Sequence, residues 1–158
     1  MKTITVGISD MKIVRVPDLL ISYALGSCVG VCIIDKSAQV AGMAHILLSY
    51  NKNGDKNIFK YADTGITEMV RQMEGLGALK SRMTAKIAGG AKMFEIKGSS
   101  SLGHIGERNV AATKETLADL KIRITAQDVG KNYGRTITFD SSTGKLTIKS
   151  FGKELKVI

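Results

Sequence analysis

Tryptophan is absent from this sequence, and its 158 residues include only one proline and two cysteines. Cys28 and Cys32 lie four residues apart on a predicted strand and cannot easily bridge within one extended segment, so both are expected to be reduced thiols. No apolar run is long enough to span a membrane, and the N-terminus lacks a charged leader with an apolar core. These absences predict a cytoplasmic protein without membrane insertion.

The charge of the chain is strongly basic. Lysine and arginine total 23 against 14 aspartates and glutamates, which gives a net charge of +9 and suits an acidic partner surface. The basic residues are scattered, without a basic motif interleaved with aromatics, so no nucleic acid is expected as a partner. With 44% hydrophobic residues and 17 glycines, residues 1–158 are expected to form a single globular domain that needs no metal or disulfide for stability.

Apolar alternation and short β-branched runs predict strands along most of the chain. A polar turn at residues 35–38 joins two of them into a hairpin. A second turn at residues 141–144, in which Gly144 can take a positive φ, joins the last two. The predicted strands cover residues 3–8, 12–16, 28–34, 39–47, 83–88, 122–126, 135–139 and 145–151.

Two segments show helical spacing of apolar residues. The first helix is expected to begin at Asp63 or Thr64 and to end at Gly75 or Gly77. Asn109 is expected to cap the second helix, which runs to about residue 120. Many strands with two principal helices predict an α+β fold, a layered sandwich of mixed or antiparallel sheets with the helices packed outside.

Cys28 is the candidate nucleophile, because it enters an apolar strand directly after the small residues Gly26 and Ser27. Such a turn lets a substrate carbonyl approach the backbone, whose N–H groups can bind the oxygen that becomes negative. His45 is the candidate base, since it lies in an otherwise apolar stretch on the other strand of the predicted hairpin. Antiparallel pairing brings both residues to the same end, which indicates acyl or amide chemistry.

Other interpretations stay open at this point. An isolated buried cysteine or histidine is more often structural than catalytic. A zinc site built from Cys28, Cys32, His45 and His104 is a further alternative, although its spacing is unusual for zinc. The Gly-Gly pair at residues 89–90 could be taken for a phosphate loop, but a tight connection after a strand explains it better.

Five segments, in this order along the chain, carry a resemblance to a known family. They are LGSC at 25–28, GMAH at 42–45, KYADT at 60–64, AKIAGGA at 85–91 with Met93-Phe94, and IGERNV at 105–110. The series resembles the chemoreceptor glutamine deamidase family, CheD, of bacterial and archaeal chemotaxis. Members of that family are similar in fold to cysteine hydrolases of the cytotoxic-necrotising-factor type.

The resemblance implies that Cys28 attacks the side-chain amide of a receptor glutamine, forms a thioester and releases ammonia, without a cofactor. It implies that His45 acts as base and then acid, and that Ser22 orients His45 where the family typically has threonine. Pairing with imidazolium is expected to lower the pKa of Cys28 by about two units or more. Backbone N–H groups near Gly26, Ser27 and Cys28 are the expected oxyanion donors.

The resemblance also implies partners: the cytoplasmic helices of chemotaxis receptors, which are rich in Glu and Gln, and a CheC-type response-regulator phosphatase. A non-catalytic adaptation module that binds both is the alternative function. The sequence departs from the family pattern at Ser22, at Ser49 within the run LSYN, and at Val129 and Lys131. Ser22 keeps the hydroxyl of the usual threonine, whereas the other departures concern receptor selection and the rim of the pocket.

Overall fold

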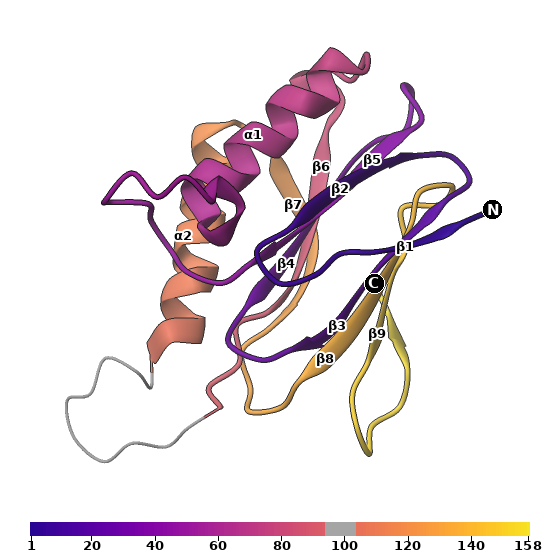
Figure 1. The fold of residues 1–158 in the computed structure, drawn as a ribbon. Helices are drawn as coiled ribbons and strands as arrows, with labels where there is room; N and C mark the ends of the chain where they lie inside the picture. Colours follow the sequence, from indigo (N-terminus) through magenta and orange to yellow (C-terminus); the bar gives the residue numbers. More distant parts are fainter. Residues whose placement is uncertain (94–103) are drawn as a thin grey trace.

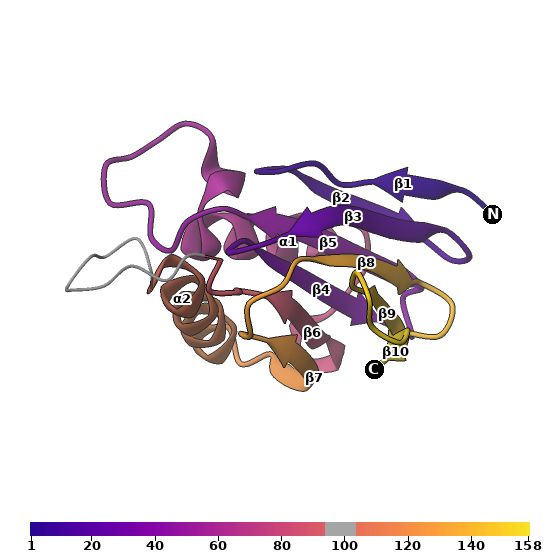
Figure 2. The ribbon, with the colours of Figure 1, turned by 90° about the horizontal axis from the view of Figure 1, so that it is seen from below.

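The computed structural model describes residues 1–93 and 104–158. Within these ranges, two five-stranded sheets and two α-helices form three layers (Figure 1). The helices cover the outer face of one sheet, and the other face of that sheet packs against the second sheet (Figure 2). The expected α+β layered sandwich is confirmed.

The middle layer is a five-stranded sheet with the order β2-β5-β4-β6-β7. All its neighbouring strands run antiparallel except β6 and β7, which are parallel. Every residue of β4 and β5 is buried, because this layer is covered on both faces. The strands are β2 (Met11–Arg15), β4 (Val29–Asp35), β5 (Val40–Ile46), β6 (Thr84–Gly89) and β7 (Arg123–Val129).

The outer sheet has the order β1-β3-β8-β9-β10, in which β1 and β3 are parallel and the other pairs antiparallel. Apolar residues of both sheets, among them Leu25, Met43 and Ile137, fill the space between the layers. The strands are β1 (Thr3–Thr5), β3 (Leu19–Leu25), β8 (Arg135–Asp140), β9 (Leu146–Lys149) and β10 (Lys156–Val157).

Helices α1 (Ala62–Gly75) and α2 (Ile105–Asp119) lie side by side on the middle sheet. A second core between helices and sheet contains Ile66, Met69 and Leu117, all fully buried. Two short 3-10 helices, η1 (Ile58–Lys60) and η2 (Lys80–Arg82), lie in the connections before α1 and before β6. Burial of one apolar stripe on each helix accounts for its place in the fold.

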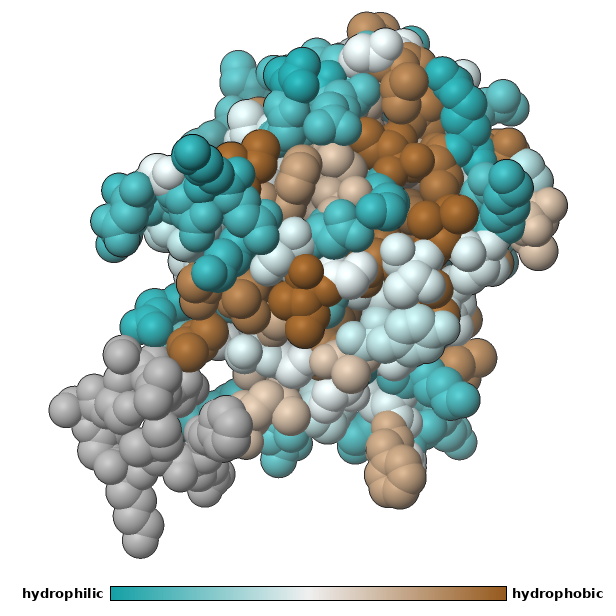
Figure 3. All heavy atoms as spheres, in the orientation of Figure 1, coloured by the Kyte–Doolittle hydropathy of each residue, from teal (hydrophilic) through white to brown (hydrophobic). Residues whose placement is uncertain are grey.

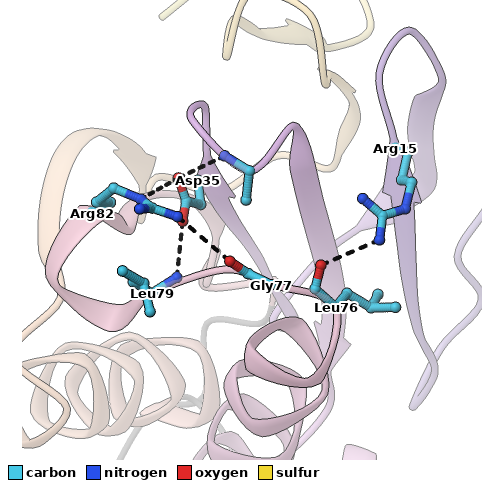
Figure 4. Close-up of polar contacts among 7 residues, drawn as sticks. Arg15, Asp35, Leu76, Gly77, Leu79 and Arg82 are labelled. Atoms are coloured by element: carbon cyan, nitrogen blue, oxygen red, sulfur yellow. Dashed lines mark hydrogen bonds and ion pairs between the residues drawn. The ribbon is translucent and has the colours of Figure 1, made fainter.

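A buried carboxylate ties the end of β4 to the connection between α1 and β6 (Figure 4). Asp35 accepts a hydrogen bond from the backbone N–H of Leu79 at 2.9 Å and pairs with Arg82 at 3.0 Å. In the same region, Arg15 donates to the backbone oxygen of Leu76 at 3.2 Å. A buried charge is tolerated when it is paired and hydrogen-bonded in this way, so the network fixes the end of the sandwich away from Cys28.

Several sequence predictions need correction. Asp63 and Thr64 do not cap the first helix; they lie inside its first turn, after Tyr61. Asn109 does not cap the second helix, which begins four residues earlier at Ile105. Strands β3 and β10 were not predicted. Both predicted hairpins are confirmed, and Gly144 has a φ of +75° in the second turn.

On the face drawn in Figure 3, hydrophobic side chains gather between helix α1 and strand β2 among hydrophilic neighbours. Within the described ranges, no helix is long and apolar enough to cross a membrane. Both cysteines are free thiols, as expected.

Candidate functional site

Cys28 is the last residue of the segment that connects β3 to β4, directly before β4 begins at Val29. Its side chain is 8% exposed and belongs to the core between the two sheets. Cys32, four residues further along β4, is fully buried in the same core. Of the two thiols, Cys28 is therefore the one that solvent reaches.

His45 lies on the neighbouring strand and shares a face with Cys28. In the antiparallel ladder, His45 of β5 is directly opposite Gly30 of β4, two residues after Cys28. Cys28 and His45 are thus diagonal neighbours, a relation that long side chains can span. A Cβ atom at Gly30 would lie 2.4 Å from the Ile137 side chain of the outer sheet, so glycine there lets the sheets close around the pair.

Ser22 reaches His45 from the other sheet. Its Oγ lies 2.7 Å from His45 Nδ1 and 2.7 Å from the backbone oxygen of Val6, and Ser22 is fully buried. A serine hydroxyl has one proton, and the Val6 carbonyl can only accept, so that proton goes to Val6. Nδ1 of His45 must then carry a hydrogen and donate it to Ser22. This contact fixes the tautomer whose other nitrogen, Nε2, is free to accept a proton.

Nε2 of His45 is buried and has no hydrogen-bond partner among the described residues. Burial lowers the pKa of the His45 imidazole and raises the pKa of the Cys28 thiol. Both shifts favour a neutral imidazole beside a protonated thiol. The expected lowering of the Cys28 pKa by imidazolium is therefore wrong for the free protein, because desolvation disfavours both charged forms.

These shifts predict the pH dependence of the site. Because the pKa of Cys28 is raised above its ordinary 9.0, its alkylation by iodoacetamide should be half-maximal only above about pH 9. Peptide mass spectrometry of Cys28 alkylated at a series of pH values measures this midpoint. An alkylation plateau already reached below pH 7 would contradict the raised pKa of Cys28.

Because the pKa of His45 is lowered below 6.5, the base stays neutral above that pH. The acidic limb of the pH–activity profile should therefore have its midpoint below about pH 6.5.

The Gly26-Ser27-Cys28 segment is held through its carbonyl groups. The Gly26 oxygen accepts from the Ala91 N–H at 2.9 Å, and the Cys28 oxygen accepts from the Gly90 N–H at 2.8 Å. The Ser27 oxygen accepts from the side chain of Asn109 at 3.0 Å. The backbone N–H groups of these three residues donate to no other residue within the described ranges. Anchored carbonyls with unused N–H groups are the arrangement that an oxyanion site requires.

Gly89 and Gly90 bring the end of β6 against Cys28. Both have positive φ, +111° and +65°. A Cβ atom at Gly89 would lie 2.2 Å from the backbone oxygen of Cys28, and one at Gly90 would lie 2.3 Å from the Val110 side chain of α2. The Gly-Gly pair thus serves close backbone approach, as the sequence interpretation favoured over a phosphate loop.

Sequence reasoning missed the part that Asn109 plays here. Its side-chain nitrogen donates to the backbone oxygens of Ser27 at 3.0 Å and Leu47 at 2.9 Å, and its oxygen accepts from the Ser49 hydroxyl at 3.0 Å. The sequence offered one indication of this role. Asn109 is a polar residue on the buried face of an amphipathic helix, and a buried polar side chain needs hydrogen-bond partners.

Three of the four residues that depart from the family pattern line two hollows near this site. Val129 and Lys131 line one of about 400 Å³ that includes Gly90. Ser49 lines another of about 460 Å³ that includes Arg108. Gly90 donates its N–H to the Cys28 oxygen, and Ser49 donates to Asn109, so each hollow shares one residue with the hydrogen bonds around the nucleophile segment.

The alternative zinc site gains no support. His104 contacts Glu107 at 3.4 Å. Across residues 1–93 and 104–158, no three His, Cys, Asp or Glu side chains are grouped as metal ligands. Phe94, one residue of the resemblance, lies outside the described residues.

Comparison with known proteins gives consistent matches. Residues 47–150 match the family described as CheD chemotactic sensory transduction. Proteins named "Probable chemoreceptor glutamine deamidase CheD" are 48% identical in Lachnoclostridium phytofermentans and 46% identical in Syntrophomonas wolfei, over 98% and 99% of this chain and 98% and 99% of theirs. A second 48% match, from Caldanaerobacter subterraneus, covers 99% of this chain and 98% of its own length.

A solved structure of a Neisseria meningitidis protein of family DUF152 superposes with a TM-score of 0.51 at 11% identity. The match covers 83% of this chain and 64% of the other. At this identity the likeness concerns the fold alone.

Proposed function

Because this chain belongs to the CheD family, we propose that it is a protein-glutamine glutaminase that converts glutamine side chains of chemotaxis receptors to glutamate, with Cys28 as nucleophile. One observation carries the chemical part of the proposal. The Ser22 contact places the ring proton of His45 on Nδ1 and leaves Nε2 as an unpaired acceptor on the face that His45 shares with Cys28. A buried acceptor next to a reachable thiol is suited to general-base activation of that thiol.

In the first half-reaction, His45 Nε2 takes the thiol proton as the Cys28 sulfur attacks the carbon of the glutamine carboxamide. The negative oxygen that forms is stabilised by backbone N–H groups of the Gly26-Ser27-Cys28 segment. The imidazolium then gives its proton to the amide nitrogen, the C–N bond breaks and ammonia leaves. Because the Cys28 thiol and the His45 imidazole are both neutral before the reaction, the desolvated site does not hold a permanent thiolate–imidazolium ion pair.

In the second half-reaction, water attacks the thioester on Cys28 while His45 Nε2 takes a proton from the water. The tetrahedral intermediate collapses, the C–S bond breaks and the sulfur regains its proton from the imidazolium. Glutamine and water have then become glutamate and ammonia, and both side chains are in their starting states. This chain needs no cofactor for the reaction.

The substrate side of the proposal rests on charge as well as on family. A net charge of +9 favours encounter with the acidic helices of receptor cytoplasmic domains. We place the reaction in the cytoplasm, where those helices are. By the same family membership, a CheC-type response-regulator phosphatase is proposed as a second partner, which binds a surface that does not require the Cys28 thiol.

The proposed function is tested by incubating the protein with receptor cytoplasmic domains from the same cell and mapping the products by peptide mass spectrometry. Expected are specific glutamines converted to glutamate, with ammonia released in equal amount. Receptor that stays fully amidated after prolonged incubation, while it binds the protein, would favour the non-catalytic adaptation module instead.

A further inference from the structure

Asn109 occupies a buried position in α2 that faces the ends of β4 and β5. It is 1% exposed and uses its whole side-chain amide. One hydrogen of the amide nitrogen reaches the Ser27 carbonyl and the other reaches the Leu47 carbonyl, at 3.0 Å and 2.9 Å. The amide oxygen accepts from the Ser49 hydroxyl at 3.0 Å, which makes the assignment of nitrogen and oxygen self-consistent.

The two carbonyls that Asn109 joins flank the candidate catalytic pair. Ser27 precedes Cys28, and Leu47 follows His45 by two residues. The ladder between β4 and β5 ends at the pair Val29 and Ile46. Beyond this pair, the backbone N–H of Leu47 donates a hydrogen bond to the backbone oxygen of Lys60 instead of to β4. Asn109 therefore bridges the two strands at the point where their own pairing stops.

We infer that Asn109 is a positioning residue, which sets the distance and orientation of Cys28 relative to His45 by clamping the backbone on both sides of the pair. The inference rests on the proposed function. Asn109 does not itself donate to the oxyanion, because both of its N–H bonds are used. It acts through the Ser27 carbonyl. In a trans peptide the N–H of Cys28 points opposite to that carbonyl, so holding the carbonyl against α2 directs the Cys28 N–H away from the helix.

Only a neutral amide meets the demands of this position. Two carbonyl acceptors on one side require two donors, and the Ser49 hydroxyl on the other side requires an acceptor. An aspartate would bring a carboxylate against two carbonyl oxygens, and a serine offers a single hydrogen on a shorter side chain. Ser49 is then the residue that orients the amide, which gives a role to one of the departures from the family pattern.

The test replaces Asn109 with alanine, with Thr113→Ala as the matched control. Thr113 is fully buried one turn further along α2, and its hydroxyl has no hydrogen-bond partner within the described part of the chain. For Asn109→Ala we expect kcat on receptor domains to fall by at least about tenfold, with KM nearly unchanged. The alkylation midpoint of Cys28 should shift down towards that of an ordinary thiol, because a released segment is better solvated. Thr113→Ala should change neither kcat nor the alkylation midpoint of Cys28.

Ser49→Ala and the unmutated protein provide two further tests. If Asn109→Ala does not fold, Ser49→Ala removes only the contact to the amide oxygen, and it should shift the Cys28 alkylation midpoint in the same direction by a smaller amount. An active wild-type protein whose Asn109→Ala variant folds and keeps its kcat and alkylation profile overturns the positioning role, as does an unchanged profile in Ser49→Ala. A wild-type protein that never deamidates receptors overturns the proposed function instead.

Discussion

Replacing Cys28 with alanine is expected to abolish the deamidation of receptor glutamines while leaving the fold intact. No other group at the site can form the thioester, so the residual rate should be indistinguishable from that of receptor alone. Losing one sulfur atom from a small side chain at the edge of the core should lower the free energy of unfolding by only about 1 kcal/mol. Peptide mass spectrometry of receptor domains measures the activity, and urea unfolding measures the stability.

Cys32→Ala is the matched control, because it makes the same truncation four residues further along the same face of β4. Cys32 is fully buried, and burial raises the pKa of its thiol. Its loss should cost stability and leave the deamidation rate unchanged. The Cys28→Ala protein should also still bind a CheC-type phosphatase, since binding needs no thiolate. Equal loss of deamidation in both cysteine variants would contradict the assignment of Cys28 as nucleophile.

The local parts of the fold could be predicted from the sequence. The strands β4 and β5 are runs of buried apolar residues separated by a polar turn, and their pairing follows from that proximity. Since the hairpin was predictable, so was the placement of Cys28 and His45 at the same end of it. The helices were predictable in extent within a few residues, because their apolar spacing is regular.

The non-local parts could not be predicted. Strand β3 pairs with β8, more than a hundred residues later, and with β1 in parallel. A register irregularity between Ser22 and Leu25, and a positive φ at Ala24, interrupt its alternation. No local sequence pattern predicts such a strand, so the residues alone did not indicate that Ser22 would reach His45 from a second sheet. Family resemblance supplied that expectation.

The ionisation of the site also depends on tertiary structure. Cysteine and histidine in a sequence suggest an ion pair, whereas the folded chain surrounds them with two packed sheets and disfavours both charges. Asn109 illustrates the same limit. Asparagine near a helix start is most simply a cap, and only the folded chain reveals that it bonds the strand ends next to Cys28.

Replacing Ser22 with alanine is expected to lower the deamidation rate by about ten- to a hundredfold, the range for loss of a group that orients a catalytic side chain. The hydroxyl is the acceptor for the Nδ1 hydrogen of His45, and the fixed tautomer leaves Nε2 able to take the Cys28 proton. Without it, the tautomer with hydrogen on Nε2 becomes populated, and that form cannot accept the proton. The kcat on receptor domains, followed by ammonia release, measures the effect.

The stability of the same variant adds an independent readout, because Ser22 also donates to the Val6 carbonyl. Its removal deletes the buried hydrogen bonds that Ser22 makes with Val6 and His45, so the free energy of unfolding should fall by about 1–3 kcal/mol. Ser22→Thr is the matched control: it keeps the hydroxyl, adds a methyl group that restricts the rotamer, and should retain the rate or raise it slightly. If Ser22→Ala deamidates receptor at the rate of the unmutated protein, the contact with Ser22 does not orient His45 for catalysis, and Cys28 and His45 act as a dyad.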